Sequence, residues 1–333
     1  MIALDANGAD HGPATVAEGG RLSGSEVTLF GPAAELAGFD RVVDAPVSIG
    51  NDEEPVRAVR SKPESSIAQA MRAVAAGQAD AVVSAGPTGA ALAAAIVHLR
   101  RLRGVHRPGI AVMLPVPGSP TLMVDVGANV EVRPEHLVQF AYMGSAFMEA
   151  VHGVERPRVG LLSIGEEAKK GTPDVVEAHE RLAAAQASSI NFIGNVEGTD
   201  VTAGVADVIV TDGFTGNVAL KLMEGTARTV VGAVRDAVGS SPVSMLGGLL
   251  IRGAVGGLRR ELDPNTTGGA ILLGVRGIVV IAHGGSSEKG IANAVRVAQT
   301  AVDERMIERT AAALERGGAL RSAPTATVAP IDE

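Results

Sequence analysis

The sequence contains no cysteine and very few aromatic residues. Among its 333 residues there is no Cys, no Trp and one Tyr, and aromatic residues together make up 2%. The absence of cysteine excludes disulfides, thiolate catalysis and cysteine-ligated metals. The scarcity of aromatic rings argues against sites that stack nucleic-acid bases or enclose cations in aromatic cages.

An excess of positive charge is also missing. The chain has 29 Lys and Arg residues against 37 Asp and Glu residues, which gives a net charge of −8. A general nucleic-acid binder carries the opposite imbalance, so we expect no nucleic-acid partner. Any anionic substrate must be attracted by a local group of cations, because the overall field of the protein repels it.

Long apolar segments do not occur. No run reaches the roughly eighteen uncharged apolar residues that a transmembrane helix needs. The N-terminus, Met1-Ile-Ala-Leu-Asp5, lacks the basic and apolar regions of a secretion signal. We therefore expect a cytoplasmic protein.

Short apolar runs alternate with polar, glycine-rich turns. Hydrophobic residues make up 46% of the chain, enough for a large core. Strand, polar turn and helix in this order are typical of an open parallel α/β sheet, which binds ligands at the carboxyl ends of its strands. No Pro/Ser linker divides the body, so we predict one domain over residues 1–316. The strand-like runs in the middle of the chain are Thr121–Val124, Val159–Ile164, Asn191–Ile193 and Asp207–Thr211.

The turn Asp212–Asn217 opens a helix-like segment. Glycine lets backbone N–H groups approach an oxyanion, and a helix N-terminus adds positive partial charge. The turn offers backbone donors over Gly213–Gly216, the Thr215 hydroxyl and the Asn217 amide, although it lacks the spacing of a Walker loop. We predict that it binds phosphate. The ordinary interpretation of Lys221, four residues further on, is a surface charge.

Two turns in the N-terminal half have similar chemistry. Asp5 begins a turn with a second carboxylate, an amide and an imidazole; the alternative is an Asx-rich turn that caps the next helix. In the turn Ser84–Gly89, Thr88 can cap a helix while Gly86 exposes a backbone donor, and such turns are common in α/β proteins. We predict substrate contacts from Asp5, Gly86 and Thr88.

Candidate catalytic residues occur in three turns. His283 follows an apolar run and is accompanied by the flexible Gly284 and the Ser286 hydroxyl, although a histidine at a strand end is often structural. Lys170 lies in a charged loop and can bind phosphate as a point charge; solvated loop charge is the alternative. Our catalytic set consists of His283, Lys170 and Asn217. The candidate phosphate ligands in the surrounding turns are Asn129, Gly165, Asn195, Gly284 and Ser286.

Two segments indicate docking surfaces. A basic run fits the docking of an acidic partner, and its alternative is a solvated helix end. Its candidate residues are Arg100, Arg101, Arg103 and Arg107. The segment Val243–Leu258 mixes apolar residues with glycine, which fits either an interfacial helix or a dimer-interface helix. Its candidate membrane-contact residues are Leu246, Leu249, Leu250 and Ile251.

Seven motifs occur in order along the chain: Ser84-Ala-Gly86, Asp125-Val-Gly-Ala-Asn129, Pro134-Glu-His136, Gly160–Glu167, Asn191–Gly198, Asp212–Lys221 and Gly268–Gly274. Taken together and in this order, they resemble the bacterial acyl-ACP:phosphate acyltransferase (PlsX) family over nearly the whole chain. The chain departs from the family pattern at Asn7, Ala9, Pro87 and Thr172-Pro173.

The resemblance implies a three-layer α/β/α fold related to phosphotransacetylases and isocitrate-type dehydrogenases. It implies that a long-chain acyl-ACP and inorganic phosphate are converted to acyl phosphate and free carrier protein, an early step of phospholipid synthesis. It also implies a homodimer that associates peripherally with membrane through a helical hairpin at about residues 239–262. No cofactor or metal is expected. Residues 317–333, rich in Ala, Pro, Thr and Ser, are predicted to be a disordered tail.

Three alternatives remain at this stage. A short-chain acyl-CoA phosphotransacetylase would have the same fold. A dehydrogenase is disfavoured because no Gly-x-Gly-x-x-Gly fingerprint follows the first strand. A non-catalytic membrane scaffold would bind vesicles without consuming phosphate.

Overall fold

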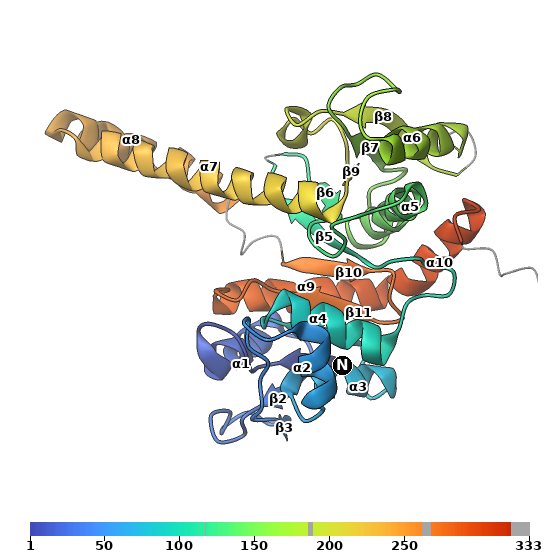
Figure 1. The fold of residues 1–333 in the computed structure, drawn as a ribbon. Helices are drawn as coiled ribbons and strands as arrows, with labels where there is room; N and C mark the ends of the chain where they lie inside the picture. The colour runs from blue at the N-terminus through green and yellow to red at the C-terminus, as the bar shows by residue number, and fades with distance from the viewer. Residues whose placement is uncertain (117, 186–188, 262–267, 321–333) are drawn as a thin grey trace, which may run out of the picture.

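The computed structural model describes residues 1–116, 118–185, 189–261 and 268–320, with the side chains of the second hairpin helix described as far as Leu250 (Figure 1). Its strands are β1 (Ile2–Asp5), β2 (Val27–Gly31), β3 (Val42–Asp44), β4 (Ala81–Ser84), β5 (Gly109–Leu114), β6 (Thr121–Val124), β7 (Arg158–Leu162), β8 (Asn191–Val196), β9 (Val208–Val210), β10 (Ala270–Leu273) and β11 (Ile278–Ile281). They form one sheet in the order β3-β2-β1-β4-β11-β10-β5-β6-β9-β7-β8.

Helices cover both faces of this sheet. One face packs against α1 (Gly12–Ser23), α5 (Pro134–Val151), α6 (Pro173–Ala185), α9 (Glu288–Asp303) and α10 (Met306–Arg316). The other packs against α2 (Pro55–Ser61), α3 (Ser66–Ala75), α4 (Thr88–Ala94), the π-helical turn η1 (Ala95–Leu99) and the start of α7 (Gly213–Gly239). A 3-10 turn, η2, spans Asp200–Thr202. The predicted three-layer α/β/α fold is confirmed, and strands buried on both faces explain the continuous apolar runs.

The sheet consists of two parallel halves that run in opposite directions. Strands β3, β2, β1, β4 and β11 are mutually parallel, as are β6, β9, β7 and β8. Between them, β10 is antiparallel to β11 and to β5, and β5 is antiparallel to β6. The carboxyl ends of the two halves therefore face opposite edges. An open parallel sheet was predicted from the sequence, and this reversal was not.

The helical hairpin is longer than predicted. Helices α7 and α8 (Pro242–Glu261) pack against each other and extend away from the body (Figure 1). The turn between them lies at residues 240–241, so the whole of α7 forms one arm of the hairpin. A Cβ on Gly248 would lie 2.3 Å from Val238 Cγ1, so this glycine allows the arms to approach closely. Among the described helices, none combines the length and hydropathy that a membrane crossing requires.

The C-terminal segment differs from the prediction at the start of the tail. Helices α9 and α10 precede the tail and are separated at Arg305, whose φ is 53°. The predicted tail begins with ordered residues, because Ala319 and Leu320 pack on the core and the Ala319 carbonyl accepts a hydrogen bond from Gln139 Nε2 at 2.7 Å. The rest of the predicted tail, residues 321–333, lies outside the described residues.

Candidate active site

A pocket of about 380 Å³ lies on the sheet face between α4 and α7. Its floor is apolar and comes from the central strands β5, β10 and β11. Its walls carry hydroxyl, amide, imidazole, ammonium and carboxylate groups. The lining residues are Thr88, Gly89, Leu92, Ile110, Val112, Val126, Gly127, Asn217, Leu220, Lys221, Glu224, Gly269, Ala270, Ile281, Ala282, His283, Ser286 and Gly290.

Four predicted site residues meet in this pocket. Thr88 comes from the start of α4, and His283 and Ser286 come from the turn after β11. Asn217 comes from the first turns of α7, on the opposite wall. The turns after β4 and β11 belong to one half of the sheet and α7 follows β9 of the other half, so the pocket joins the two halves over the central strands. The pocket thus lies between the halves of the sheet and not along one edge.

A backbone hydrogen bond selects the tautomer of neutral His283. Its Nδ1 accepts a hydrogen bond from the Gly285 backbone N–H at 3.1 Å, so a neutral ring carries its proton on Nε2. The turn is tied to the first strand's turn, because the Asp10 N–H donates to the Gly284 carbonyl at 3.0 Å. A neutral His283 is therefore a hydrogen-bond donor through Nε2. It can stabilise the oxyanion that develops in acyl transfer.

The charged pair Lys221 and Glu224 was not predicted from the sequence, where Lys221 was interpreted as a surface charge. Both line the pocket, and Lys221 Nζ lies 3.0 Å from Glu224 Oε2. Lys221 follows Asn217 by four residues, the spacing that places two side chains on one face of a helix. That spacing was the available signal. The apolar strand β5, which contributes Ile110 and Val112 to the floor, was also missed; its apolar run between two prolines would have identified it.

The turn before α7 has a structural role in this molecule. Asp212 caps the helix by accepting from the Thr215 N–H at 2.8 Å and from the Thr215 hydroxyl at 2.7 Å. The Gly213 N–H donates to the Asn129 carbonyl at 2.7 Å, and the Gly216 N–H donates to the Asp212 carbonyl at 3.0 Å. The backbone donors that were predicted to bind phosphate at these three positions are thus used inside the protein.

The turn after β6 is organised by a buried carboxylate. Asp125 accepts from the N–H groups of Ile110, Gly127, Ala128 and Asn129 at 2.7–3.2 Å, and from Asn129 Nδ2 at 2.8 Å. Burial raises the pKa of Asp125, and these hydrogen bonds oppose that shift. Asn129 Nδ2 also donates to the Pro108 carbonyl at 2.7 Å, so its amide N–H groups hold the turn together.

Asp5 and Gly86 do not line the pocket, but they are hydrogen-bonded through Ser84 in the turn that leads to Thr88. Asp5 is 2% exposed, and its Oδ2 accepts from the Ser84 hydroxyl at 2.7 Å. Ser84 Oγ in turn accepts from the Gly86 N–H at 3.1 Å, which fixes the backbone just before Thr88. Burial raises the pKa of Asp5 to about 6, against opposing hydrogen bonds from Ser66, Ser84 and Asn7.

Lys170, Gly165 and Asn195 lie together at the carboxyl ends of β7 and β8, outside the lining of the pocket. Asn195 Nδ2 donates to the Glu167 carbonyl at 2.9 Å, and its Oδ1 lies 2.9 Å from His179 Nδ1. The Lys170 side chain is exposed. In the single chain, these residues therefore form a separate polar cluster beyond β9.

The four candidate docking arginines follow η1, at the opposite end of the α4–η1 segment from Thr88. All four are exposed. Their loop is held on α5 by Gln139, whose side chain accepts from the His106 N–H at 2.8 Å and donates to the Gly104 carbonyl at 2.9 Å. The arrangement presents positive charge from an ordered loop. The residues are Arg100, Arg101, Arg103 and Arg107.

On α8, three of the four candidate membrane-contact residues have described side chains. Leu246, Leu249 and Leu250 are 61%, 63% and 80% exposed, so this helix presents an apolar surface that the single chain does not cover. The prediction for the Ile251 side chain falls outside the described residues.

Near the basic loop, the ligand atoms of His106, Glu135 and His136 lie within 4.8 Å of one another. The Arg133 N–H donates to His136 Nδ1 at 3.2 Å, so a neutral His136 carries its proton on Nε2. That tautomer has no second lone pair for a metal. The geometry therefore does not favour a metal site here.

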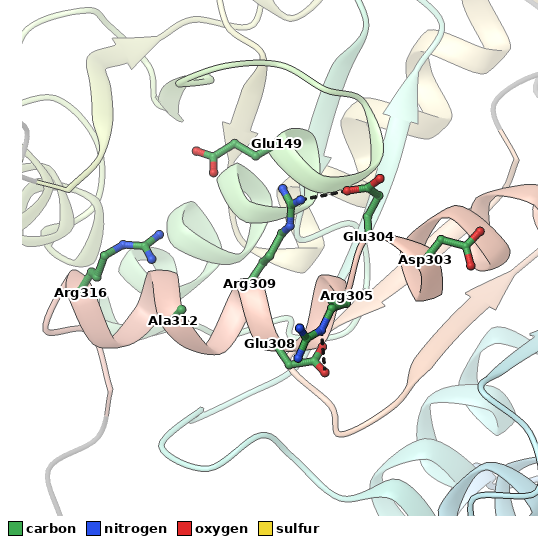
Figure 2. Close-up of a pocket in the computed structure, with 8 residues that line it drawn as sticks. All are labelled: Glu149, Asp303, Glu304, Arg305, Glu308, Arg309, Ala312 and Arg316. Atoms are coloured by element: carbon green, nitrogen blue, oxygen red, sulfur yellow. Dashed lines mark hydrogen bonds and ion pairs between the residues drawn. The ribbon is translucent and has the colours of Figure 1, made fainter.

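A second pocket, of about 540 Å³, lies along α10 (Figure 2). Its walls mix both signs of charge: Arg309 pairs with Glu304 at 2.9 Å, and Arg305 lies 3.7 Å from Glu308. Its lining contains none of the predicted site residues, whereas the pocket between α4 and α7 contains four and is the candidate active site.

Comparison with known proteins identifies the family of this chain. Residues 1–309 match the model of a family described as "Fatty acid synthesis protein". A relative from Desulfitobacterium hafniense (strain Y51), named "Phosphate acyltransferase", is 42% identical over 329 residues, covering 95% of this chain and 97% of the relative. A protein of the same name from Streptococcus pneumoniae is 42% identical over 93% of this chain and 97% of the relative.

The chain belongs to the family that this model describes and that includes these phosphate acyltransferases. It is therefore an acyltransferase enzyme of fatty-acid and lipid synthesis, and the scaffold alternative is wrong.

Among solved structures, a phosphotransacetylase from Streptococcus pyogenes superimposes with a TM-score of 0.61 at 16% identity, covering 91% of this chain and 94% of its own. A branched-chain phosphotransacylase from Enterococcus faecalis V583 gives 0.55 at 14% identity, with 91% and 99% covered. These likenesses show the fold alone.

Proposed function

We propose that this family member transfers a long-chain acyl group from the thioester of an acyl carrier protein to inorganic phosphate. The observation that carries the proposal is the pocket, which joins an apolar floor to a polar rim. Leu92, Ile110 and Leu220 offer surface to an acyl chain, while Asn217 and His283 offer hydrogen-bond donors to phosphate and to the developing oxyanion.

The reaction requires one proton movement. An oxygen of hydrogen phosphate attacks the thioester carbonyl, the C–S bond breaks, and the phosphate proton ends on the carrier thiol. His283 suits this reaction because its Nε2–H can donate a hydrogen bond to the developing oxyanion, while the phosphate proton passes to the departing sulfur. Holding phosphate beside the carbonyl supplies the remaining advantage.

The decisive experiment incubates the purified protein with palmitoyl-ACP and phosphate and traps acyl phosphate as its hydroxamate. Product that requires phosphate supports the proposal. A parallel reaction with palmitoyl-CoA and acetyl-CoA separates the carrier-dependent activity from that of a short-chain phosphotransacetylase. The proposal fails if no thioester gives acyl phosphate or if acetyl-CoA is the preferred donor.

We also propose that the enzyme is a homodimer that associates with membrane surfaces through the hairpin. The support is the apolar surface of Leu246, Leu249 and Leu250 on an arm that extends from the body. Sedimentation equilibrium tests the dimer. Flotation with phosphatidylglycerol vesicles tests the membrane contact, and replacement of the three leucines by serine should abolish flotation without dissociating the dimer.

A further inference from the structure

Lys221 holds a distinctive position among the residues of the pocket. Of the described residues that line it, Lys221 is the one lysine or arginine. The chain as a whole is acidic, so a phosphate anion that enters this pocket needs a local cation. Lys170, the lysine indicated by the sequence, lies outside the pocket lining.

Lys221 is already paired with an acid in the same wall. Its Nζ lies 3.0 Å from Glu224 Oε2, and the Glu224 side chain is only 19% exposed whereas that of Lys221 is 56% exposed. The carboxylate is therefore held close to the wall, while the ammonium group can reach into solvent. An ion pair at this spacing on an exposed helix is weak, so a better anion can replace the carboxylate at little cost.

Asn217 lies one turn before Lys221 on the same face of α7, and both line the pocket. The Asn217 side chain is exposed and has no partner among the described residues, in contrast to Asn129 and Asn195. An ammonium and a primary amide on one helix face suit an oxyanion with several acceptor oxygens.

We propose that Lys221 is the cation that binds inorganic phosphate, and that Glu224 is a competing carboxylate which phosphate displaces from it. The proposal rests on the proposed acyl transfer to phosphate and adds the residue pair that sets phosphate affinity. Glu224 stays close to the bound anion and opposes it. This repulsion weakens phosphate binding. In the absence of phosphate, the Glu224 carboxylate neutralises Lys221. A phosphate dianion displaces the carboxylate because two negative charges are attracted to Lys221 more strongly than one.

The test compares Lys221→Gln, Lys221→Arg and Glu224→Gln with the wild type. We expect Lys221→Gln to raise the KM for phosphate at least about tenfold and to leave the KM for palmitoyl-ACP within about twofold. Lys221→Arg should retain most of the affinity, and Glu224→Gln should lower the KM for phosphate severalfold. Arg228→Gln is the matched control, because Arg228 is exposed two turns further along α7 and does not line the pocket.

An unchanged KM for phosphate in Lys221→Gln overturns the proposal. A rise in the KM for palmitoyl-ACP alone also overturns it, because Lys221 would then bind the phosphate group of the carrier's prosthetic arm. Calorimetric titration with inorganic phosphate tests binding without turnover. If the wild type makes no acyl phosphate, the proposed function fails, yet phosphate heat that is lost in Lys221→Gln and kept in Arg228→Gln still supports the pair. Equal heat in all variants contradicts it.

Discussion

Gly216 packs against the backbone of Asp125 so closely that a Cβ on Gly216 would lie 2.0 Å from the Asp125 carbonyl oxygen. This contact joins the first turn of α7 to the turn after β6. A Cβ on Gly213 would lie 2.9 Å from Asp125 Oδ2, which gives a second close approach at the same junction. The glycines that resemble a phosphate-binding loop in the sequence are required here by packing.

We therefore expect Gly216→Ala to destabilise the protein by at least about 2 kcal/mol, because the backbone oxygen cannot move away from the new methyl group without breaking the Asp125 turn. Gly225→Ala on the same helix is the control, since its Cβ meets nothing within 4 Å. That change should stabilise the helix by roughly 0.5–1 kcal/mol. Urea denaturation measures both values. Equal stability of the two variants would contradict the packing role.

The buried carboxyl of Asp5 predicts a pH dependence of stability. Its pKa is raised from 3.8 to about 6, so the folded protein binds its proton more tightly than the unfolded chain does. The stability that this proton provides is complete below about pH 4 and is lost as the pH rises through about 6, with a magnitude on the order of 3 kcal/mol. Asp5→Asn should remove this dependence. Denaturation of both proteins between pH 4.5 and 7.5 measures the difference, and parallel curves would show that Asp5 does not titrate in this range.

Asn217→Ala tests the exposed amide in the pocket. We expect kcat to fall at least about tenfold, because an aimed donor to an oxyanion contributes about 2.7–4 kcal/mol elsewhere. The fold should be unaffected, since the Asn217 side chain is exposed. Steady-state kinetics with a circular dichroism spectrum gives both quantities. Unchanged turnover removes Asn217 from the site.

The hydrogen bond from the Gly285 N–H to His283 Nδ1 makes a specific prediction about substitutions. A glutamine side chain places an amide N–H close to the position of histidine Nε2, whereas an asparagine side chain reaches only the position of Nδ1. If His283 acts as a donor through Nε2, His283→Gln should keep about tenfold more activity than His283→Asn. A ranking in which both variants equal His283→Ala would exclude the donor role.

The exposed arginines of the basic loop predict salt-dependent docking of an acidic carrier protein. Replacing Arg100 and Arg103 by glutamate should raise the KM for acyl-ACP about tenfold or more and change kcat less, and added salt should weaken the wild type toward the variant. The KM for acyl-CoA should change little, because that donor lacks the protein surface. Activity on acyl-ACP that is indifferent to both changes would show that docking occurs elsewhere.

The sequence by itself determined the fold class and the family of this protein. Continuous apolar strands followed by glycine turns require a sheet buried on both faces, and the ordered motifs from Ser84 to Gly274 identify the acyltransferase family. It also identified Thr88, Asn217, His283 and Ser286, because each belongs to a polar turn or helix start next to an apolar strand.

Tertiary structure alone decided which of these turns share a pocket. The antiparallel strand β10 and the pair β5–β6 reverse one half of the sheet, a non-local pairing that turn motifs do not encode. Lys221 and Glu224 lie on α7, which forms a pocket wall, whereas Lys170 follows β7, beyond β9, and lies outside the pocket. Hydrogen bonding likewise separated Asn217, whose amide remains available, from Asn129 and Asn195, whose amides hold their own turns. A residue's type is fixed by the sequence, but its available donors depend on the neighbours that folding supplies.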